Sequence, residues 1–107
     1  MIYCFDIDDT ICKTKGQNYT ESQPIHNRIK IINNLYDEGN IILFSTARGM
    51  GRTDNCVDLA KSMFFDLTAK QLNDWGVKYH KLFLGKPSGD FYVDDKGVKD
   101  EDFFESE

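Results

Sequence analysis

Three aspartates stand close together near the start of the chain, directly after a short apolar run. The run covers residues 2–5, and the acids are Asp6, Asp8 and Asp9. Like charges this close raise one another's pKa and cost free energy unless a positive charge lies among them. Residues i and i+2 of an extended chain point the same way, so Asp6 and Asp8 are placed to act together. The stretch therefore predicts either a solvated turn or a cation site.

Polar residues also follow three later apolar runs. Ser45, Thr46 and Arg48, with Ala47 between them, follow the run that begins at Ile41. Lys86 follows Leu82–Leu84 after Gly85, and Asp94 and Asp95 follow Phe91–Val93. In a mainly parallel sheet, ligands bind beyond the carboxyl ends of the strands. The four polar ends are therefore predicted to meet at one rim of a sheet.

Carboxylates, a lysine and a hydroxyl at one rim favour a site for a hard divalent cation and a phosphate. Mg²⁺ takes oxygen ligands, with one or two carboxylates completed by water and substrate phosphate. A cation between Asp6 and Asp94 would remove the repulsion, and Lys86 would hold phosphate oxygens as a point charge. A carboxylate there can attack phosphorus, and a second one can move the protons of the two half-reactions.

The elements that must position these ends alternate between strands and helices. Strands are predicted at residues 2–7, 41–44, 82–84 and 91–93, and helices from Pro24 to the stop at Gly39, around Ala60, and in a short further helix capped by Thr68 and Gln71. This alternation predicts an α/β domain with a mainly parallel central sheet. The acidic tail at 100–107 is expected to lie on the surface or to fray.

Chain length, net charge and cysteine count predict the number of domains, the partners and the cellular location. With 107 residues, the chain is expected to be one domain, residues 1–107. A net charge of −5, from 18 acidic and 13 basic residues, offers little to a phosphate backbone, so nucleic acid is not expected as a partner. The odd count of three cysteines and the lack of a leader or a membrane-spanning run predict a cytoplasmic protein that has no membrane partner.

The four segments DIDDT, FSTAR, GKP and YVDDK, in this order, resemble the four motifs of the haloacid dehalogenase superfamily of phosphohydrolases. The resemblance implies a Rossmann-like three-layer sandwich, with Asp6 as the nucleophile that becomes phosphoaspartate and Asp8 as general acid/base. It implies Mg²⁺ bound by Asp6, the Asp8 backbone carbonyl and Asp94, with Asp95 in support. The implied phosphate-binding residues are Ile7, Asp8, Ser45, Thr46, Ala47, Arg48 and Lys86.

Two assignments within this set stay open. Ser45 can take the place of Thr46 as the hydroxyl of the second motif, although the Ala-Arg that follows favours Thr46. Arg48 is interpreted equally as a substrate contact and as a structural ion-pair partner.

The motifs are separated by short stretches, so the chain resembles the members that lack a cap domain. The run WGVKYHKLFLGKPSGDFYVDDK is also similar to small phosphatases of bacterial capsule and surface-polysaccharide synthesis, which implies a small phosphorylated sugar or polyol as substrate. An open site would suit a homo-oligomer, in which a neighbouring subunit serves as the lid. The alternatives are a polynucleotide 3′-phosphatase or phosphotransferase of the same fold, and a catalytically silent or receiver-like regulatory domain.

Overall fold

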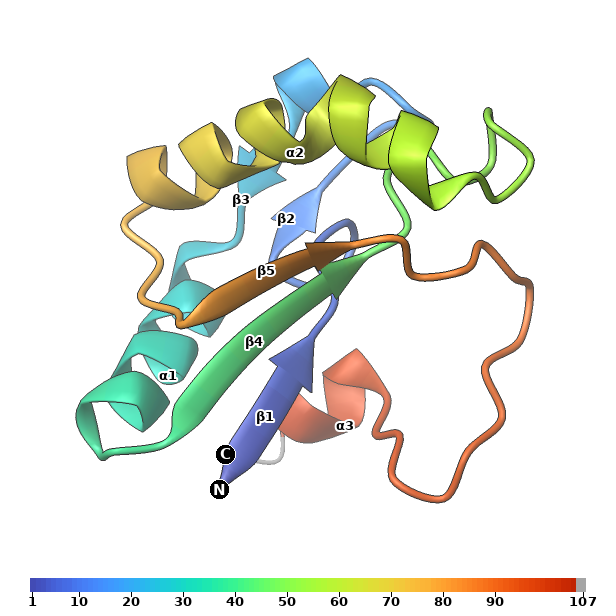
Figure 1. The fold of residues 1–107 in the computed structure, drawn as a ribbon. Coiled ribbons are helices and arrows are strands. Elements are labelled where there is room, and N and C mark those ends of the chain that lie inside the picture. Colours follow the sequence, from blue (N-terminus) through green and yellow to red (C-terminus); the bar gives the residue numbers. More distant parts are fainter. Residues whose placement is uncertain (106–107) are drawn as a thin grey trace.

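The structure is a computed structural model that describes residues 1–105. The strands β1, β4 and β5 alternate with the helices α1 and α2, as the sequence predicts (Figure 1). In chain order they are β1 (Ile2–Phe5), β2 (Cys12–Lys13), the 3₁₀ helix η1 (Tyr19–Glu21), β3 (Gln23–Pro24), α1 (His26–Asp37), β4 (Ile41–Thr46), α2 (Val57–Asp74), β5 (Lys81–Leu84) and α3 (Asp100–Glu105).

The main sheet has three parallel strands in the order β1-β4-β5. Phe5 of β1 pairs with Phe44 of β4, and Thr46 of β4 pairs with Leu84 of β5, so the three strands end at one rim. The short strands β2 and β3 form a separate antiparallel hairpin beyond the end of β1. The expected α/β fold with a mainly parallel sheet is confirmed.

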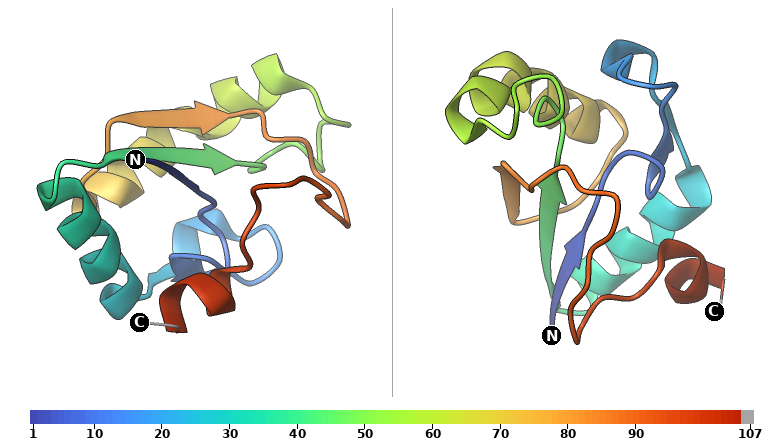
Figure 2. Two further views of the ribbon diagram at one scale, coloured as in Figure 1. Left: turned by 90° about the horizontal axis from the view of Figure 1, so that it is seen from below. Right: turned by 90° about the vertical axis from the view of Figure 1, so that its right-hand side faces the viewer.

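The three helices pack on one face of this sheet. Phe44 of β4 belongs to a single buried cluster with Ile32 of α1, Leu72 of α2 and Phe104 of α3. Figure 2 shows the arrangement of the helices around the three strands in two views. Successive crossovers in one direction along a parallel sheet are right-handed, which places α1 and α2 on the same side. In residues 1–105 the structure therefore has one helical layer against the sheet.

The opposite face of the sheet is open. Ile2 of β1 is 67% exposed and Phe83 of β5 is 47% exposed, and both alternate with residues that point toward the helices. Cys4, which continues the Ile2 side of β1, is exposed as well. The second helical layer of a three-layer sandwich is not found in the part of the chain that the structure describes.

Two helix predictions are wrong in their boundaries. Thr68 and Gln71 do not start a separate helix, because α2 runs unbroken from Val57 to Asp74 and both side chains are buried in its second half. Pro24 does not open α1 but pairs with Cys12 in the hairpin, and α1 begins two residues later. In both cases a tertiary contact overrides a local signal.

The predicted strand at residues 91–93 is also wrong. Phe91 and Val93 are 87% and 95% exposed, and neither belongs to any strand. Figure 1 shows this part of the chain, in orange, as a wide loop that leaves the end of β5 and returns to α3. The run has the composition of a strand but no pairing partner in this structure.

The acidic tail is more ordered than expected. Residues 100–105 form α3, whose Phe103 and Phe104 pack against Phe5 at ring-centroid distances of 5.4 Å and 5.9 Å. Asp100 at the start of α3 accepts a hydrogen bond from Arg28 of α1 at 2.7 Å. Of the two predicted alternatives, a surface position or fraying, residues 100–105 take the first, since α3 exposes Glu101, Asp102 and Glu105, and residues 106–107 lie outside the described part. No helix among the described residues is long and apolar enough to cross a membrane.

The docking of α3 gives a testable prediction. Phe104→Ala removes a nearly fully buried ring, so we expect the free energy of unfolding to fall by about 3 kcal/mol in urea denaturation. Phe91→Ala is the matched control, since its exposed ring should change stability by less than about 0.5 kcal/mol. Equal stability of Phe104→Ala and the wild type would contradict the packing of α3.

Candidate active site

The rim at the ends of the strands brings together three of the predicted residues. Lys86 follows β5, and its backbone N–H donates to the carbonyl of Thr46 at 3.2 Å. Its Nζ lies 3.9 Å from Oδ2 of Asp6, which follows β1. Gly85 allows this turn, because it has φ +107° and an added Cβ would lie 2.8 Å from Cγ1 of Val57. A lysine and a carboxylate thus face each other across the end of β4.

Burial raises the pKa of the Asp6 carboxyl above its ordinary value. Lys86 and a hydrogen bond from the Ile7 backbone act in the opposite direction, while the negative charges of Asp8 and Asp9 add to the increase. The Asp6 side chain is still 38% exposed. It is therefore a carboxylate that is short of positive charge and open to a ligand.

Asp8 has a different environment. The carbonyl of Ile7 accepts the N–H of Thr10 at 3.1 Å, and this turn directs Asp8 back toward the domain. Arg48 donates to both carboxylate oxygens of Asp8, from Nε to Oδ2 and from Nη2 to Oδ1, each at 3.0 Å. The Thr14 hydroxyl donates to Oδ1 at 2.7 Å. The Asp8 carboxylate is thus held in one orientation, with its side chain 23% exposed.

Arg48 lies inside the domain with a fully buried side chain. Besides Asp8, it donates from Nη1 to the Thr68 hydroxyl at 3.1 Å and to the Gln71 amide oxygen, and its guanidinium lies 4.8 Å from the centre of the Tyr19 ring. All three of its nitrogens have partners. Of its two predicted roles, Arg48 takes that of structural ion-pair partner in this structure.

The two hydroxyls of the second motif lie on opposite faces of β4. Thr46 is buried on the helix-covered face, and its Oγ1 accepts the backbone N–H of Arg48 at 3.2 Å. Ser45 is half-buried on the open face. Ala47 follows them, half-buried, and its backbone N–H stays a predicted phosphate contact, as do both hydroxyls.

The structure does not bring Asp94 and Asp95 to the rim. Both are exposed in the loop after β5, where Asp94 accepts the backbone N–H of Gly97 at 2.8 Å and that of Lys96. These two hydrogen bonds lower the pKa of Asp94. Within residues 1–105, no three His, Cys, Asp or Glu side chains gather closely enough to hold a metal ion. The complete set of magnesium ligands stays a prediction.

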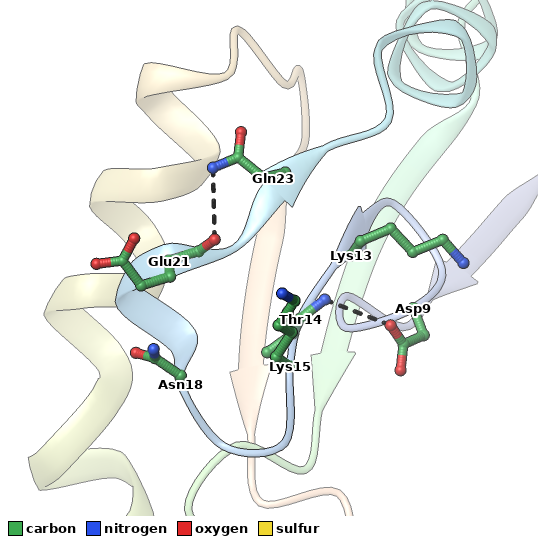
Figure 3. Close-up of a pocket in the computed structure, with 7 residues that line it drawn as sticks. All are labelled: Asp9, Lys13, Thr14, Lys15, Asn18, Glu21 and Gln23. Carbon is green, nitrogen blue, oxygen red and sulfur yellow. Dashed lines mark hydrogen bonds between the residues drawn. The ribbon is translucent and has the colours of Figure 1, made fainter.

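A cavity of about 590 Å³ opens beside the β2–β3 hairpin. Figure 3 shows its lining, which comes from the segment after β1. The residues are Asp9, Lys13, Thr14, Lys15, Asn18, Glu21 and Gln23. Thr14 joins the cavity to the rim, because its hydroxyl donates a hydrogen bond to Asp8. Asp9, also in the lining, has a left-handed φ of 61°, which is uncommon for residues other than glycine. Sequence reasoning missed Thr14 because nothing in this polar stretch marks which residue turns inward.

The comparisons with known proteins bear on the fold. No protein-family model and no curated protein sequence matches the chain. A solved crystal structure, of a structural-genomics target from Vibrio cholerae, has a TM-score of 0.87 and is 25% identical, over 95% of this chain and 85% of that chain. The similarity extends over nearly the whole chain and supports the α/β arrangement described above.

The raised pKa of Asp6 predicts how stability depends on pH. The folded protein binds this proton more tightly than the unfolded chain does, so stability falls as pH rises from the ordinary aspartate pKa of about 4 through the folded value. Without metal, Asp6→Asn should therefore unfold at a higher temperature than the wild type near neutral pH.

The gain from Asp6→Asn should vanish well below the ordinary aspartate pKa, where the wild-type carboxyl is also neutral. The exposed Asp66→Asn, in the middle of α2, is the control and should change little at either pH. Thermal unfolding followed by circular dichroism measures both variants. An Asp6→Asn variant that is less stable than the wild type near neutral pH would contradict the desolvation of Asp6.

Proposed function

We propose that the protein is a Mg²⁺-dependent phosphomonoesterase of the haloacid dehalogenase type, without a cap domain, that acts through a phosphoaspartate at Asp6. The observation that carries the proposal is the rim geometry. An accessible, partly desolvated carboxylate faces Lys86 at 3.9 Å, and a second, oriented carboxylate follows two residues later. This is the arrangement that a nucleophile with its acid/base partner requires.

The chemistry divides between the two aspartates. An oxygen of the Asp6 carboxylate attacks phosphorus, the bond from phosphorus to the ester oxygen breaks, and Asp8, which must enter this step as the neutral acid, gives its proton to the leaving oxygen. A water molecule then loses a proton to Asp8 and attacks the phosphoaspartate, which releases phosphate and restores Asp6. Lys86 and the backbone N–H groups of Ile7 and Ala47 would hold the phosphoryl oxygens throughout.

The donor atoms at the end of β1 fit a magnesium ion. Carboxylate and carbonyl oxygens are its preferred ligands, and a cation at Asp6 would offset the charges of Asp8 and Asp9 that now raise its pKa. When bound, Mg²⁺ would neutralise charge on the transferring phosphoryl group. Asp94 and Asp95 complete the proposed ligand set only if the loop after β5 moves toward β1.

The proposed fold is the Rossmann-like sandwich of that superfamily. The sheet order β1-β4-β5, with a helix in each crossover, supports this assignment. A third layer would lie on the open face, beside Ile2 and Phe83. A second copy of the chain could supply that cover, and the homo-oligomer stays a prediction.

The proposed substrate is a small phosphorylated sugar or polyol, as in capsule or surface-polysaccharide synthesis. The cavity beside Asp8 supports this choice, because its lysines and amides can bind hydroxyl and anionic groups on the part of the substrate that leaves. The net charge of −5 counts against a polynucleotide 3′-phosphatase. Free Cys4, Cys12 and Cys56 are in keeping with a cytoplasmic location.

Phosphate release tests the proposal. We expect the wild type to hydrolyse p-nitrophenyl phosphate and at least one member of a panel of sugar and polyol phosphates with Mg²⁺, and to lose this activity in EDTA. Asp6→Asn should lower kcat/KM by about 10³-fold or more, because it removes the nucleophile. Asp66→Asn, on the exposed side of α2, should keep full activity.

The other outcomes of this assay separate the alternatives. Transfer of the phosphoryl group to an added alcohol in preference to water would identify a phosphotransferase. A protein that hydrolyses none of the esters while it still binds Mg²⁺ would contradict the proposal and favour a regulatory domain.

The proposed metal ligands predict a change in the loop after β5. Addition of Mg²⁺ should slow amide hydrogen exchange at residues 90–95, because the loop must approach Asp6 to supply Asp94. Asp94→Asn should remove this protection and weaken Mg²⁺ binding, measured by calorimetry, by about tenfold or more. Exposed Asp90→Asn, in the same loop, is the control. Mg²⁺ binding that is equally strong in Asp94→Asn would contradict the assigned ligand.

A further inference from the structure

We propose that Arg48 is a positioning residue that orients Asp8 for proton transfer, and that Gln71 and Tyr19 fix Arg48 in turn. This role rests on the proposed function, because it gives Asp8 a reaction in which its orientation matters. It goes beyond both roles predicted from the sequence, a substrate contact and a structural ion-pair partner, because it links the ion pair to proton transfer.

The geometry of the ion pair supports an orienting role. Arg48 meets Asp8 with two nitrogens on two oxygens, and such a fork fixes the plane of the carboxylate as well as its position. A lysine in the same place would be a point charge without this directionality. The Thr14 hydroxyl adds a contact to Oδ1, so rotation of the carboxylate would break three hydrogen bonds.

The guanidinium is itself held from three directions. Thr68 and Gln71, one turn apart on α2, accept from Nη1, and the Tyr19 ring of η1 covers the guanidinium face at 4.8 Å. Gln71 also donates to the carbonyl of Tyr19 at 2.6 Å, which closes the ring of contacts. With no exposure to water, Arg48 has no other arrangement available without the loss of a buried partner.

This network joins the acid/base residue to the wall of the cavity. Tyr19 lies in η1, between the cavity residues Asn18 and Glu21, and Thr14 both lines the cavity and contacts Asp8. The Asp8 carboxylate would thus have a fixed position and orientation relative to a leaving group bound in the cavity. Arg48 sets that position and orientation, and it touches no reacting atom.

The two leaving groups differ in their need for a proton, and this difference provides a test. If Arg48 served the fold alone, its substitution would lower kcat/KM equally for both esters. p-Nitrophenolate departs without a proton, whereas the alkoxide of glycerol 2-phosphate requires protonation by the general acid. kcat/KM reports the steps up to the release of the leaving group. We therefore compare kcat/KM for the two esters, with Mg²⁺, in Arg48→Lys, Gln71→Met and Tyr19→Leu.

The expected result is a selective loss. Arg48→Lys should lower the ratio of kcat/KM for glycerol 2-phosphate to that for p-nitrophenyl phosphate by about tenfold or more, and Gln71→Met and Tyr19→Leu should lower it less. Ile32→Val is the control, because it trims a fully buried side chain of α1 that lies in the apolar core and not in the hydrogen-bond network of Arg48. It should reduce thermal stability and leave the ratio unchanged.

Two outcomes would overturn the proposal in different ways. Equal losses on both esters in the folded variants would show that Arg48 serves the fold alone, and Gln71→Met carries this decision if Arg48→Lys does not fold. A wild type that hydrolyses neither ester would overturn the proposed function, and the role of Arg48 with it.

Discussion

The buried ion pair between Asp8 and Arg48 is the contact on which the rim of the sheet depends. A guanidinium without access to water is stable only with a complete set of partners. Here these partners come from the turn after β1, the second half of α2 and η1. The pair joins segments 40 residues apart. It therefore fixes the turn after β1 against the turn after β4, and Thr14 and Tyr19, between β2 and β3, contact the two members of the pair.

Asp6 shows the opposite balance of burial and charge. It loses much of its water but gains only Lys86, whose Nζ at 3.9 Å lies beyond a hydrogen bond, and a backbone N–H. Two carboxylates that are two residues apart in the sequence thus differ in their environments, one saturated with donors and the other short of positive charge. This difference supports Asp6, the accessible carboxylate, as the proposed nucleophile, and Asp8, the oriented one, as its proposed partner in proton transfer.

The sequence predicts the parallel strands β1, β4 and β5, because each is an apolar run that is followed by charged or hydroxyl-bearing residues. It fails at residues 91–93, since an apolar triplet reads as a strand whether or not a partner is present. It also fails at α3. The acidic residues there suggest an exposed segment, whereas Phe103 and Phe104 pack against Phe5. The partner of Arg48 could not be predicted, because Asp8, Thr68 and Gln71 come together only in the folded chain.

The central claim is that Asp6 carries the phosphoryl group during turnover. Its most direct test is acid quenching of the protein during steady-state hydrolysis, with Mg²⁺, followed by mass spectrometry of the tryptic peptide that ends at Lys13. The account predicts the added mass of one phosphoryl group on Asp6 and its absence in Asp6→Asn. Hydrolysis at full rate with that peptide unmodified, or with the phosphoryl group on another residue, would contradict it.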